Sequence, residues 1–515
     1  MGAMDYLVLG GYGVLMLWLG LVARRRSDSL EEYFAAGHRL PWWMAAISHH
    51  VSGYSAVVFV GFAGKAAGAG LSMWTLFSVP CFIALMIGAL LWAPRWARLR
   101  VLTPVEYLEA RFGGSVRLAV ALAGIGVKFI DLGIKLYALA LVVQVCTGWE
   151  LTSVIAGVGA VTVAYVLVGG LWATVLTDLA QFVVQLGLSG LVMVVVLQQM
   201  GGWGTLWDRL PAGHTGLLNP DAGIGLGFWM VYLVVIIMSY NGATWGLAQR
   251  FIAVETPRQS QKVAMLSGFL FLLYPLVIFI PAWAAPFLLP GHFDPATHQP
   301  LPGFDPDHTY VLLAQQVLSG LGPGLVGLLV CSMFAATMSM VDSDLNALAA
   351  VFTRDVYQRC WGAQDSTRQA ARVGRAATLV FGLAVLATAL AVARAPGVGK
   401  VFEQTVKLFA AILPPVAVPL MCGMLWRRTT ARGALLAMAG GFATFVVLKW
   451  LYPADFAVYT GGEILVALLL FFGEGLVSRH PAGRARQVAE LFDRLEGRSA
   501  PGTGVADPGA RRENG

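Results

Sequence analysis

The sequence predicts an all-α protein that crosses the membrane many times, with about thirteen transmembrane helices. Its mean hydropathy is +0.71, and only 12% of its 515 residues are charged, whereas soluble proteins average roughly a quarter. Apolar stretches of about 20 residues, enough to cross the hydrocarbon core, recur along most of the chain. The formal net charge of +7 lies in alternate loops, which is typical of membrane orientation and not of nucleic-acid binding.

The apolar stretches can be placed in order along the chain. They lie near residues 4–23, 42–66, 71–94, 117–146, 150–168, 173–199, 225–247, 263–289, 323–353, 374–394, 402–425, 431–451 and 460–478. The first has no basic start and no small-residue cleavage site, and Arg24–Arg26 follows it. We therefore expect a retained helix in the cell membrane, with the N-terminus outside and the C-terminus cytoplasmic. Basic clusters such as Arg250, Arg258 and Lys262 then fall inside.

Two of these spans are interrupted by polar and small residues near mid-membrane. The second breaks at residues 48–55, Ser-His-His-Val-Ser-Gly-Tyr-Ser, and the seventh at residues 239–246, Ser-Tyr-Asn-Gly-Ala-Thr-Trp-Gly. They are five crossings apart and so run in opposite directions. Interrupted helices at matching positions of inverted halves indicate a transporter's binding site, because unwound backbone in a membrane must line a cavity. The alternative is that these small residues only pack between helices.

The ninth span carries the densest polar sequence within an apolar helix. From Phe334 to Ala347 it reads Phe-Ala-Ala-Thr-Met-Ser-Met-Val-Asp-Ser-Asp-Leu-Asn-Ala. A charge at the centre of a bilayer costs about 2.5–3.5 kcal/mol on insertion scales, so such residues face a partner or an ion pathway. This span is therefore the first candidate for a functional site.

Five segments, taken together and in order, resemble the sodium:solute symporter family, the group of bacterial sodium/proline, sodium/galactose and sialic acid transporters. The segments are Asp28–Trp43, Tyr165–Gln181, Gln249–Arg250, Ala335–Tyr357 and Met424–Ala434. The resemblance implies a LeuT-like core, an inverted repeat of five plus five helices with flanking helices at each end. It also implies sodium-driven uptake by alternating access.

That fold divides the chain into five parts. They are an N-terminal extra helix with a cytoplasmic linker (1–40), a first five-helix repeat (41–200), a second, inverted repeat with outer loops (201–426), two additional helices (427–479) and a cytoplasmic tail (480–515). The tail is charged and rich in Gly and Pro, so we expect it to be disordered. One short amphipathic helix near Arg486–Arg498 is expected within it.

The resemblance implies a sodium site between the broken second span and the ninth span. The ligands carried over by position are the carbonyl groups of Val51, Tyr54 and Ala336, the hydroxyl group of Ser339 and residue 340. Residue 340 is Met340, and this departs from the family's hydroxyl. A thioether is a soft ligand, whereas sodium takes oxygen, so coupling to sodium is less certain at this position.

A second cation site, found in some members of the family, would correspond to Asp178, Ser339, Asp342 and Ser343. Spacings of three and four place the last three on one face of a helix. Asp342 stands where those members have a hydroxyl, and it can bind an ion one turn away or carry a proton. It can instead pair with a lysine, because the fourth span carries Lys128, Asp131 and Lys135. Asp344 points off that face and has no assigned role.

Five residues are candidates for contact with a solute, and each has a structural alternative. They are His49, His50, Tyr240, Asn241 and Lys407. The two histidines lie in the second-span break and can pack, bind the solute or accept a proton, and Tyr240 matches the inner gate tyrosine of the family's sugar transporters. Lys407 can equally form an i,i+4 pair with Glu403. If they face the cavity, Lys65, Lys407 and the histidines suit a carboxylate-bearing solute.

The sequence therefore predicts a secondary active transporter, and no enzyme, that couples sodium flow to uptake of a small organic solute. A sugar, a sugar acid and another organic anion all remain candidates. One alternative keeps the fold and uses protons or sodium-independent exchange, with Asp342, Asp178 or His50 as the titrating group. Another alternative is a membrane solute sensor built on a transporter body. No obligate protein partner is evident from the sequence.

Overall fold

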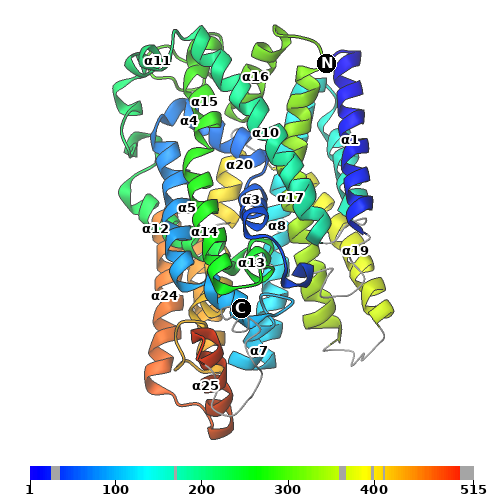
Figure 1. Ribbon diagram of the computed structural model, residues 1–515. Helices are drawn as coiled ribbons and strands as arrows, with labels where there is room; N and C mark the ends of the chain where they lie inside the picture. The colour runs from blue at the N-terminus through cyan, green and yellow to red at the C-terminus, as the bar shows by residue number, and fades with distance from the viewer. Residues whose placement is uncertain (25–34, 167–170, 359–366, 396–399, 410–411, 499–515) are drawn as a thin grey trace, which may run out of the picture.

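The protein is a bundle of membrane-length helices. The computed structural model describes residues 1–24, 35–166, 171–358, 367–395, 400–409 and 412–498. Within these ranges, nine helices are long and apolar enough to cross a membrane, and three shorter apolar helices accompany them. The bundle confirms the predicted all-α polytopic architecture (Figure 1). The count of thirteen spans and the internal repeat stay predictions.

The helices follow one another in three stretches of chain. The first holds α1 (Ala3–Arg24), α3 (Trp42–Ser52), α4 (Ala63–Ala69), α5 (Ser72–Leu91), α6 (Ala93–Leu99), α7 (Tyr107–Arg111), α8 (Gly114–Thr147), α9 (Leu151–Val166) and α10 (Leu171–Gln199). The second holds α11 (Trp203–Arg209), α12 (Leu226–Met238), α13 (Trp245–Ile252), α14 (Pro257–Leu273), α15 (Leu276–Leu288), α16 (Thr309–Ser319), α17 (Leu325–Val351) and α19 (Thr367–Arg394). The third holds α20 (Lys400–Glu403), α22 (Pro414–Cys422), α23 (Ala431–Val446), α24 (Phe456–Val477) and α25 (Ala482–Glu496).

Short helical turns of other types join or extend these helices. The π-helical turns are η2 (Val58–Phe62), η5 (Ser239–Ala243), η7 (Phe352–Tyr357), η8 (Gln404–Phe409) and η9 (Val447–Leu451). The 3₁₀ turns are η1 (Ala36–His38), η3 (Ala212–His214), η4 (Pro220–Ala222) and η6 (Pro306–His308). Single π-turns inside α-helices are frequent at functional sites. Here η2 follows the first predicted break, and η5 lies within the second.

Both predicted breaks are present. Helix α3 ends at Ser52, residues 53–55 are not helical, and the helix resumes at Ala56. Helix α12 ends at Met238, η5 follows, and Thr244 has extended backbone before α13 begins. A glycine in a helix interior is less stable than an alanine by about 1 kcal/mol. Both breaks contain glycine, Gly53 in the first and Gly242 in the second. The backbone groups freed in this way must find partners inside the protein.

Helix α3 lies in the middle of the bundle, where α10, α13, α14 and α17 pack around it (Figure 1).

The close approach of helix α5 to the second break depends on a glycine. A Cβ atom at Gly88 of α5 would lie 1.6 Å from the Asn241 Oδ1 atom. The Asn241 Nδ2 atom donates to the carbonyl oxygens of Ala84 and Ile237, at 2.8 and 2.9 Å. Gly88 thus lets the second break lie directly against α5.

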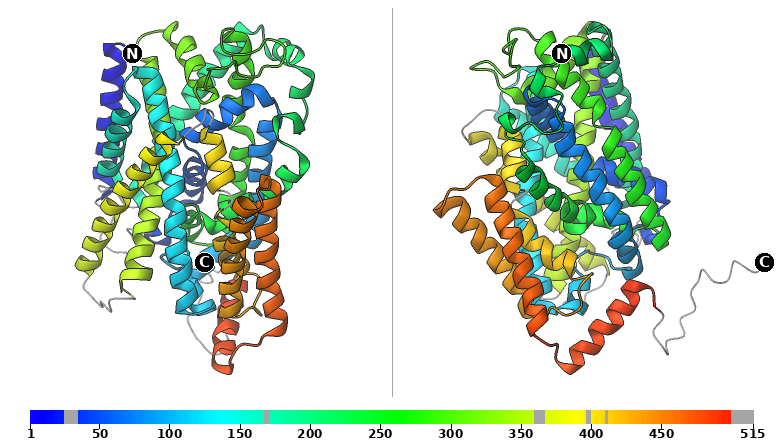
Figure 2. Two further views of the ribbon diagram at one scale, coloured as in Figure 1. Left: turned by 180° about the vertical axis from the view of Figure 1, so that it is seen from behind. Right: turned by 90° about the vertical axis from the view of Figure 1, so that its left-hand side faces the viewer.

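The long helices α8 and α17 pack together behind α3, and α1 packs against α17 and α10 at one edge (Figure 1). The last two long helices, α23 and α24, form an antiparallel hairpin that packs on α22 and α12 (Figure 2). Of the nine membrane-length helices, the one that contains α17 is the most buried, with 83% of its apolar window inside the protein. Its polar residues therefore face other helices and not lipid.

The C-terminal region differs from the predicted disordered tail. Residues 482–496 form α25, which packs on α6 and α7 at the end of the bundle opposite the N-terminus (Figure 2). The buried side chains of α25 follow helical spacing, and they are Val488, Leu491, Phe492 and Leu495. The Arg98 Nη1 atom donates to the Leu495 carbonyl at 2.7 Å, and the Arg484 Nη2 atom donates to the Glu109 carbonyl at 2.6 Å. The structure thus has the expected amphipathic helix, but its apolar face is docked on the bundle and is not part of a disordered tail.

We expect Leu495→Ala to release α25 from α6 and α7. Leu495 is fully buried, and Leu→Ala changes in packed cores cost about 2–5 kcal/mol, which exceeds what one short helix can supply alone. Hydrogen exchange of residues 482–496 should accelerate strongly in this variant. Glu490→Ala, on the exposed face of the same helix, should leave exchange unchanged. Equal exchange in both variants would contradict the docking.

Candidate functional site

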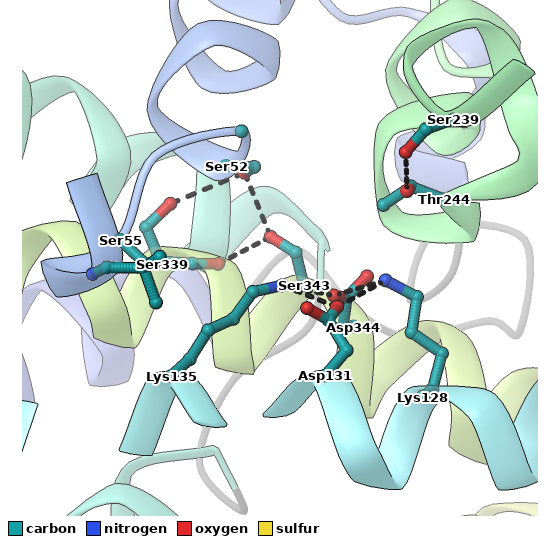
Figure 3. A network of polar contacts seen from close by, with 12 residues as sticks. Ser52, Ser55, Lys128, Asp131, Lys135, Ser239, Thr244, Ser339, Ser343 and Asp344 are labelled. Carbon is teal, nitrogen blue, oxygen red and sulfur yellow. Dashed lines mark hydrogen bonds and ion pairs between the residues drawn. The ribbon is translucent and has the colours of Figure 1, made fainter. Parts of the chain in front are cut away.

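The break in α3 faces the polar segment of α17. The Ser52 hydroxyl lies 3.3 Å from the Ser339 hydroxyl and 3.1 Å from the Ser343 hydroxyl (Figure 3). Just beyond the break, the Ala56 N–H donates to the Thr337 hydroxyl at 2.9 Å. Two segments almost 290 residues apart in sequence are thereby held side by side. The structure brings together the two halves of the predicted sodium site.

The individual predicted ligands lie at this junction. Val51 is the second-last residue of α3 and its carbonyl accepts the Tyr54 N–H at 3.0 Å, while Ala336 and Ser339 lie on the facing part of α17. Met340 instead lines the central cavity described below. The residue that replaces the family's hydroxyl therefore points toward the space where a solute would bind.

An arginine completes the polar cluster between α3, α10, α13 and α17. The Arg250 Nη2 atom donates to the Ser343 hydroxyl at 2.6 Å and to the Ser52 hydroxyl at 2.9 Å. It also forms an ion pair with the Asp178 carboxylate at 3.4 Å, and its Nε atom donates to the Ser48 hydroxyl at 3.0 Å. We call this set the serine–arginine cluster, and its members are Ser48, Ser52, Asp178, Arg250, Ser339 and Ser343.

Arg250 corrects the prediction that placed it among the basic residues of a cytoplasmic loop. Its side chain is fully buried, and its Nη1 atom donates to the Gly246 carbonyl at 2.8 Å. Counting charges between apolar stretches cannot separate a loop arginine from one that points back into the bundle. The sequence did contain a signal for this. The short helix α13, which follows the second break and carries Arg250, has its apolar and polar residues on different faces.

Asp342 lies near the cluster but outside its ion pair. Its Oδ2 atom accepts a hydrogen bond from the Thr174 hydroxyl at 2.6 Å, and the residue is only 4% exposed. Among the described residues, no basic side chain forms an ion pair with it. The predicted alternative, in which Asp342 pairs with a lysine of the fourth span, is therefore not what the structure has.

The lysines of that span pair with other acids. The Asp131 carboxylate accepts from the Lys128 and Lys135 ammonium groups at 2.9 and 2.5 Å, and Asp344 lies 2.9 Å from Lys128 (Figure 3). We call these four residues, Lys128, Asp131, Lys135 and Asp344, the lysine–aspartate network. All four are buried, and their charges cancel. Asp344 thus has a basic partner across the interface between α17 and α8, whereas Asp342 has none within the part of the chain that the structure describes.

A small cavity lies beside the two breaks. Its volume is ≈ 80 Å³, which holds only a few water molecules at about 30 Å³ each. Aromatic and aliphatic side chains form much of its wall. Its polar lining residues are Ser55, Asp131, Lys135, Ser239, Tyr240, Thr244 and Thr405. The wall must open before a solute of several heavy atoms can enter.

Aromatic side chains border the central cavity on two sides. Phe62 lines it and packs edge-on against Phe402 with the ring centroids 5.2 Å apart. Phe402 also lines an outer cavity of ≈ 170 Å³, together with Lys65 and Glu403. On the other side, the Tyr240 hydroxyl donates to the Gly53 carbonyl at 3.3 Å. The Phe62–Phe402 contact and the Tyr240–Gly53 hydrogen bond are therefore two separate contacts at the wall of the cavity.

Among the predicted solute contacts, Tyr240 lines the central cavity, while the histidines and Asn241 do not. The His49 Nδ1 atom lies 2.7 Å from the Ser267 hydroxyl, so His49 joins α3 to α14. His50 is buried among the rings of Tyr54, Phe271, Tyr274 and Phe182, and neither of its nitrogen atoms has a hydrogen-bond partner. Lys407 belongs to η8, and its side chain is outside the described residues.

Comparison with known proteins assigns a family. The model of the sodium:solute symporter family matches residues 33–441, which is most of the chain. The chain belongs to the sodium:solute symporter family. It is 26% identical to the sodium/glucose cotransporter of Vibrio parahaemolyticus over 476 residues, covering 87% of this chain and 85% of that one. It is 25% identical to the sodium/sialic acid symporter NanT of Aliivibrio fischeri, covering 91% and 92%.

Solved structures agree with the fold of this family member. A substrate-bound, outward-open Na⁺-coupled sialic acid symporter matches with a TM-score of 0.81 at 19% identity, covering 93% of this chain and 98% of that one. MhsT, solved in complex with L-phenylalanine, matches with a TM-score of 0.51 at 15% identity. The neighbours are LeuT-fold transporters. The relatives are transporters and not enzymes, so this symporter family member is a membrane transport protein.

We expect Arg250→Met to destabilise the protein strongly. Removing one partner of a buried ion pair costs about 3–5 kcal/mol, because the other charge stays buried. Adding Asp178→Asn to Arg250→Met should recover much of this loss, since it removes the stranded charge. The measurement is thermal unfolding of the purified proteins in detergent. Arg486→Met is the matched control, because its pair with Glu490 is exposed. An unchanged melting temperature for Arg250→Met would contradict the role of the cluster.

Proposed function

We propose that the protein couples the inward flow of sodium to uptake of a small organic solute. One observation carries the proposal, which is the charge balance beside the broken helix α3. Asp178 and Asp342 contribute two buried negative charges, and Arg250 contributes one positive charge. A buried charge within a membrane needs a partner or an ion pathway. A sodium ion from solution would supply the missing positive charge.

In the proposal, a first sodium position lies between α3 and α17. Its protein ligands are the carbonyl oxygens of Val51, Tyr54 and Ala336 and the Ser339 hydroxyl. The hydrogen bond between Ser52 and Ser339 supports this, because it holds the two ligand segments together. Met340 supplies no oxygen to this position, so the site is one ligand short of the family pattern.

A second position would use Asp178, Asp342 and Ser343 together with Ser339. Asp342 is the strongest ligand of this set, because the Thr174 hydroxyl is its hydrogen-bond partner and no basic side chain of the described residues pairs with it. Arg250 already binds Asp178 and Ser343. An ion at this position would therefore share these groups with the guanidinium, which couples ion binding to the packing of α13.

A proton is the alternative coupling ion. A protonated Asp342 would be neutral and would need no sodium, and its contact with Thr174 can persist because a hydroxyl can donate or accept. Asp178 and His50 are further candidates, and both have a buried polar atom without a partner. Sodium is preferred because two relatives of similar length are named as sodium cotransporters.

The transport cycle in this proposal is alternating access across two barriers. Opening the Phe62–Phe402 contact would expose the central cavity to the outside, and opening the Tyr240 contact would expose it to the cytoplasm. Sodium can favour the outward-open state only as far as it binds that state more tightly. Thirteen spans, an inverted five-helix repeat, an external N-terminus and a cytoplasmic C-terminus belong to the same proposal.

For the solute, we propose a sugar, a sugar acid or another small organic anion. The central cavity offers hydroxyl groups at Ser55, Ser239 and Thr405, and the Thr405 hydroxyl has no partner. Lys135 lines the same cavity and is already paired with Asp131. An acidic group on the solute would therefore compete with Asp131 for the Lys135 ammonium group.

Uptake by the purified protein in proteoliposomes tests the coupling ion. A panel of sugars and organic acids is offered, first under an inward sodium gradient at equal pH and then under an inward proton gradient without sodium. We expect accumulation of at least one solute only with the sodium gradient. Uptake indifferent to sodium at fixed pH rules out the proposal, and uptake driven by protons alone favours the alternative. Sodium-independent binding without any uptake would favour a sensor.

Met340→Ser should strengthen sodium binding, because it restores an oxygen at the position where the chain departs from its family. About tenfold tighter binding corresponds to about 1.4 kcal/mol, and we expect a change of that order in the sodium concentration for half-maximal uptake. The matched control is Met338→Ser, two residues away on α17 and also buried. No shift in Met340→Ser, or the same shift in both variants, would contradict the first sodium position.

A further inference from the structure

One buried acid belongs to neither the serine–arginine cluster nor the lysine–aspartate network. Glu463 of α24 is fully buried, and neither of its carboxylate oxygens has a hydrogen-bond partner. Thr460, one turn earlier on the same face, is also fully buried, and its hydroxyl has no partner either. Buried polar side chains without any partner are rare. Two of them on one helical face indicate a bound species at this position.

The face that carries Glu463 points into the protein and not toward lipid. Ala467, one turn further on, belongs to this face, and a Cβ atom at Gly441 of α23 would lie 3.4 Å from the Ala467 Cβ atom and 2.9 Å from the Pro415 Cγ atom. Helix α24 therefore packs here against α23 and against the start of α22. Glu463 thus belongs to the buried face of α24, the helix that packs on α22 and α23.

Few charged groups act on Glu463. The cation whose charge reaches it is Lys449 of η9, whose ammonium group lies 5.3 Å from the ring centre of Tyr459 and 5.1 Å from that of Phe445. Glu463 forms no ion pair among the described residues. The neighbouring titratable groups are Tyr459 on α24, Asp455 just before α24 and Glu403 on α20.

A proton fits this position better than a metal ion. Hard cations such as Ca²⁺ and Mg²⁺ take six or more oxygen ligands, and this site offers the two carboxylate oxygens and the Thr460 hydroxyl. The positive charge of the Lys449 ammonium group would also repel a metal ion bound at Glu463. An isolated buried carboxylate is strongly unfavourable, and such groups are neutralised in practice. A single proton on the carboxylate achieves this without any further ligand.

We propose that Glu463 is a proton-binding site within the membrane, separate from the coupling cluster, whose proton keeps α24 packed on α22 and α23. Loss of the proton at alkaline pH leaves an uncompensated charge in this interface and weakens its packing. Stability from this site is therefore fully present at acidic pH, where the unfolded chain is also protonated, and it falls as the pH rises because the unfolded chain releases this proton first. The site makes the protein sensitive to pH whichever ion drives transport.

Dicyclohexylcarbodiimide tests the bound proton in the full-length protein. The acid gives its proton to one carbodiimide nitrogen, its oxygen adds to the central carbon, and an acyl shift to nitrogen yields a stable N-acylurea with no leaving group. We expect mass spectrometry to find this adduct on Glu463 at neutral pH and to find less of it at alkaline pH. Glu474 of the same helix is the matched control, because its carboxylate accepts two hydrogen bonds from Thr430.

Thermal unfolding provides a second test that needs no reagent access and no transport. The melting temperature of the unmodified protein should fall from neutral to alkaline pH more steeply than that of Glu463→Gln, which keeps the shape and cannot ionise. Glu474→Gln should keep the steep fall. The proposal is overturned if Glu463→Gln and the unmodified protein fall in parallel, or if Glu463 is labelled no more than Glu474 at neutral pH. Both tests remain valid if the coupling ion is not sodium.

Discussion

The Arg250 guanidinium holds together the four helices that meet where α3 stops being helical. Its three nitrogen atoms reach Ser48 and Ser52 on α3, Gly246 on α13 and Ser343 on α17, and the ion pair with Asp178 adds α10. Inside a bilayer no water is available to satisfy an interrupted helix, so the partners must come from the protein. A planar group with five donors can bridge several acceptors at once, which a lysine cannot do. Arg250 thus fixes four helices around the break through the hydroxyl groups of α3, while the Ala56 N–H just beyond the break finds its partner in the Thr337 hydroxyl of α17.

The polar segment of α17 serves two separate charge systems because of helical geometry. Ser339, Asp342 and Ser343 share one face, which meets α3 and α10, while Asp344 points toward α8 and joins the lysine–aspartate network. That network is neutral as a whole, so it can hold α8 against α17 without an ion. The region around Asp178 and Asp342 holds two buried acids and one buried base, Arg250. Two acids two residues apart can therefore have different roles.

Much of this arrangement could be predicted from the sequence, and the failures have physical reasons. Small and polar residues in apolar runs predicted both breaks, and helical spacing predicted that Ser339 and Ser343 share a face. Spacing cannot tell which partner a charged side chain reaches, so Arg250 was placed in a loop and Lys135 was not assigned to the cavity. His49 illustrates the same limit, because its partner Ser267 lies 218 residues away. The short amphipathic helix near Arg486–Arg498 was expected, but its docking on α6 and α7 was not, because the charged composition of the tail suggested disorder.

Asp342 and Glu463 show how the surroundings of a buried acid select the cation it holds. Both lie in membrane-spanning helices and neither forms an ion pair among the described residues. Asp342 has the Thr174 hydroxyl beside it and two serine hydroxyls on its own helical face, which together can replace part of the water shell of a sodium ion. Glu463 has one hydroxyl, that of Thr460, and a lysine ammonium group nearby. In the two proposals, the supply of oxygen ligands, and not the acid itself, therefore selects the ion, which is sodium at Asp342 and a proton at Glu463.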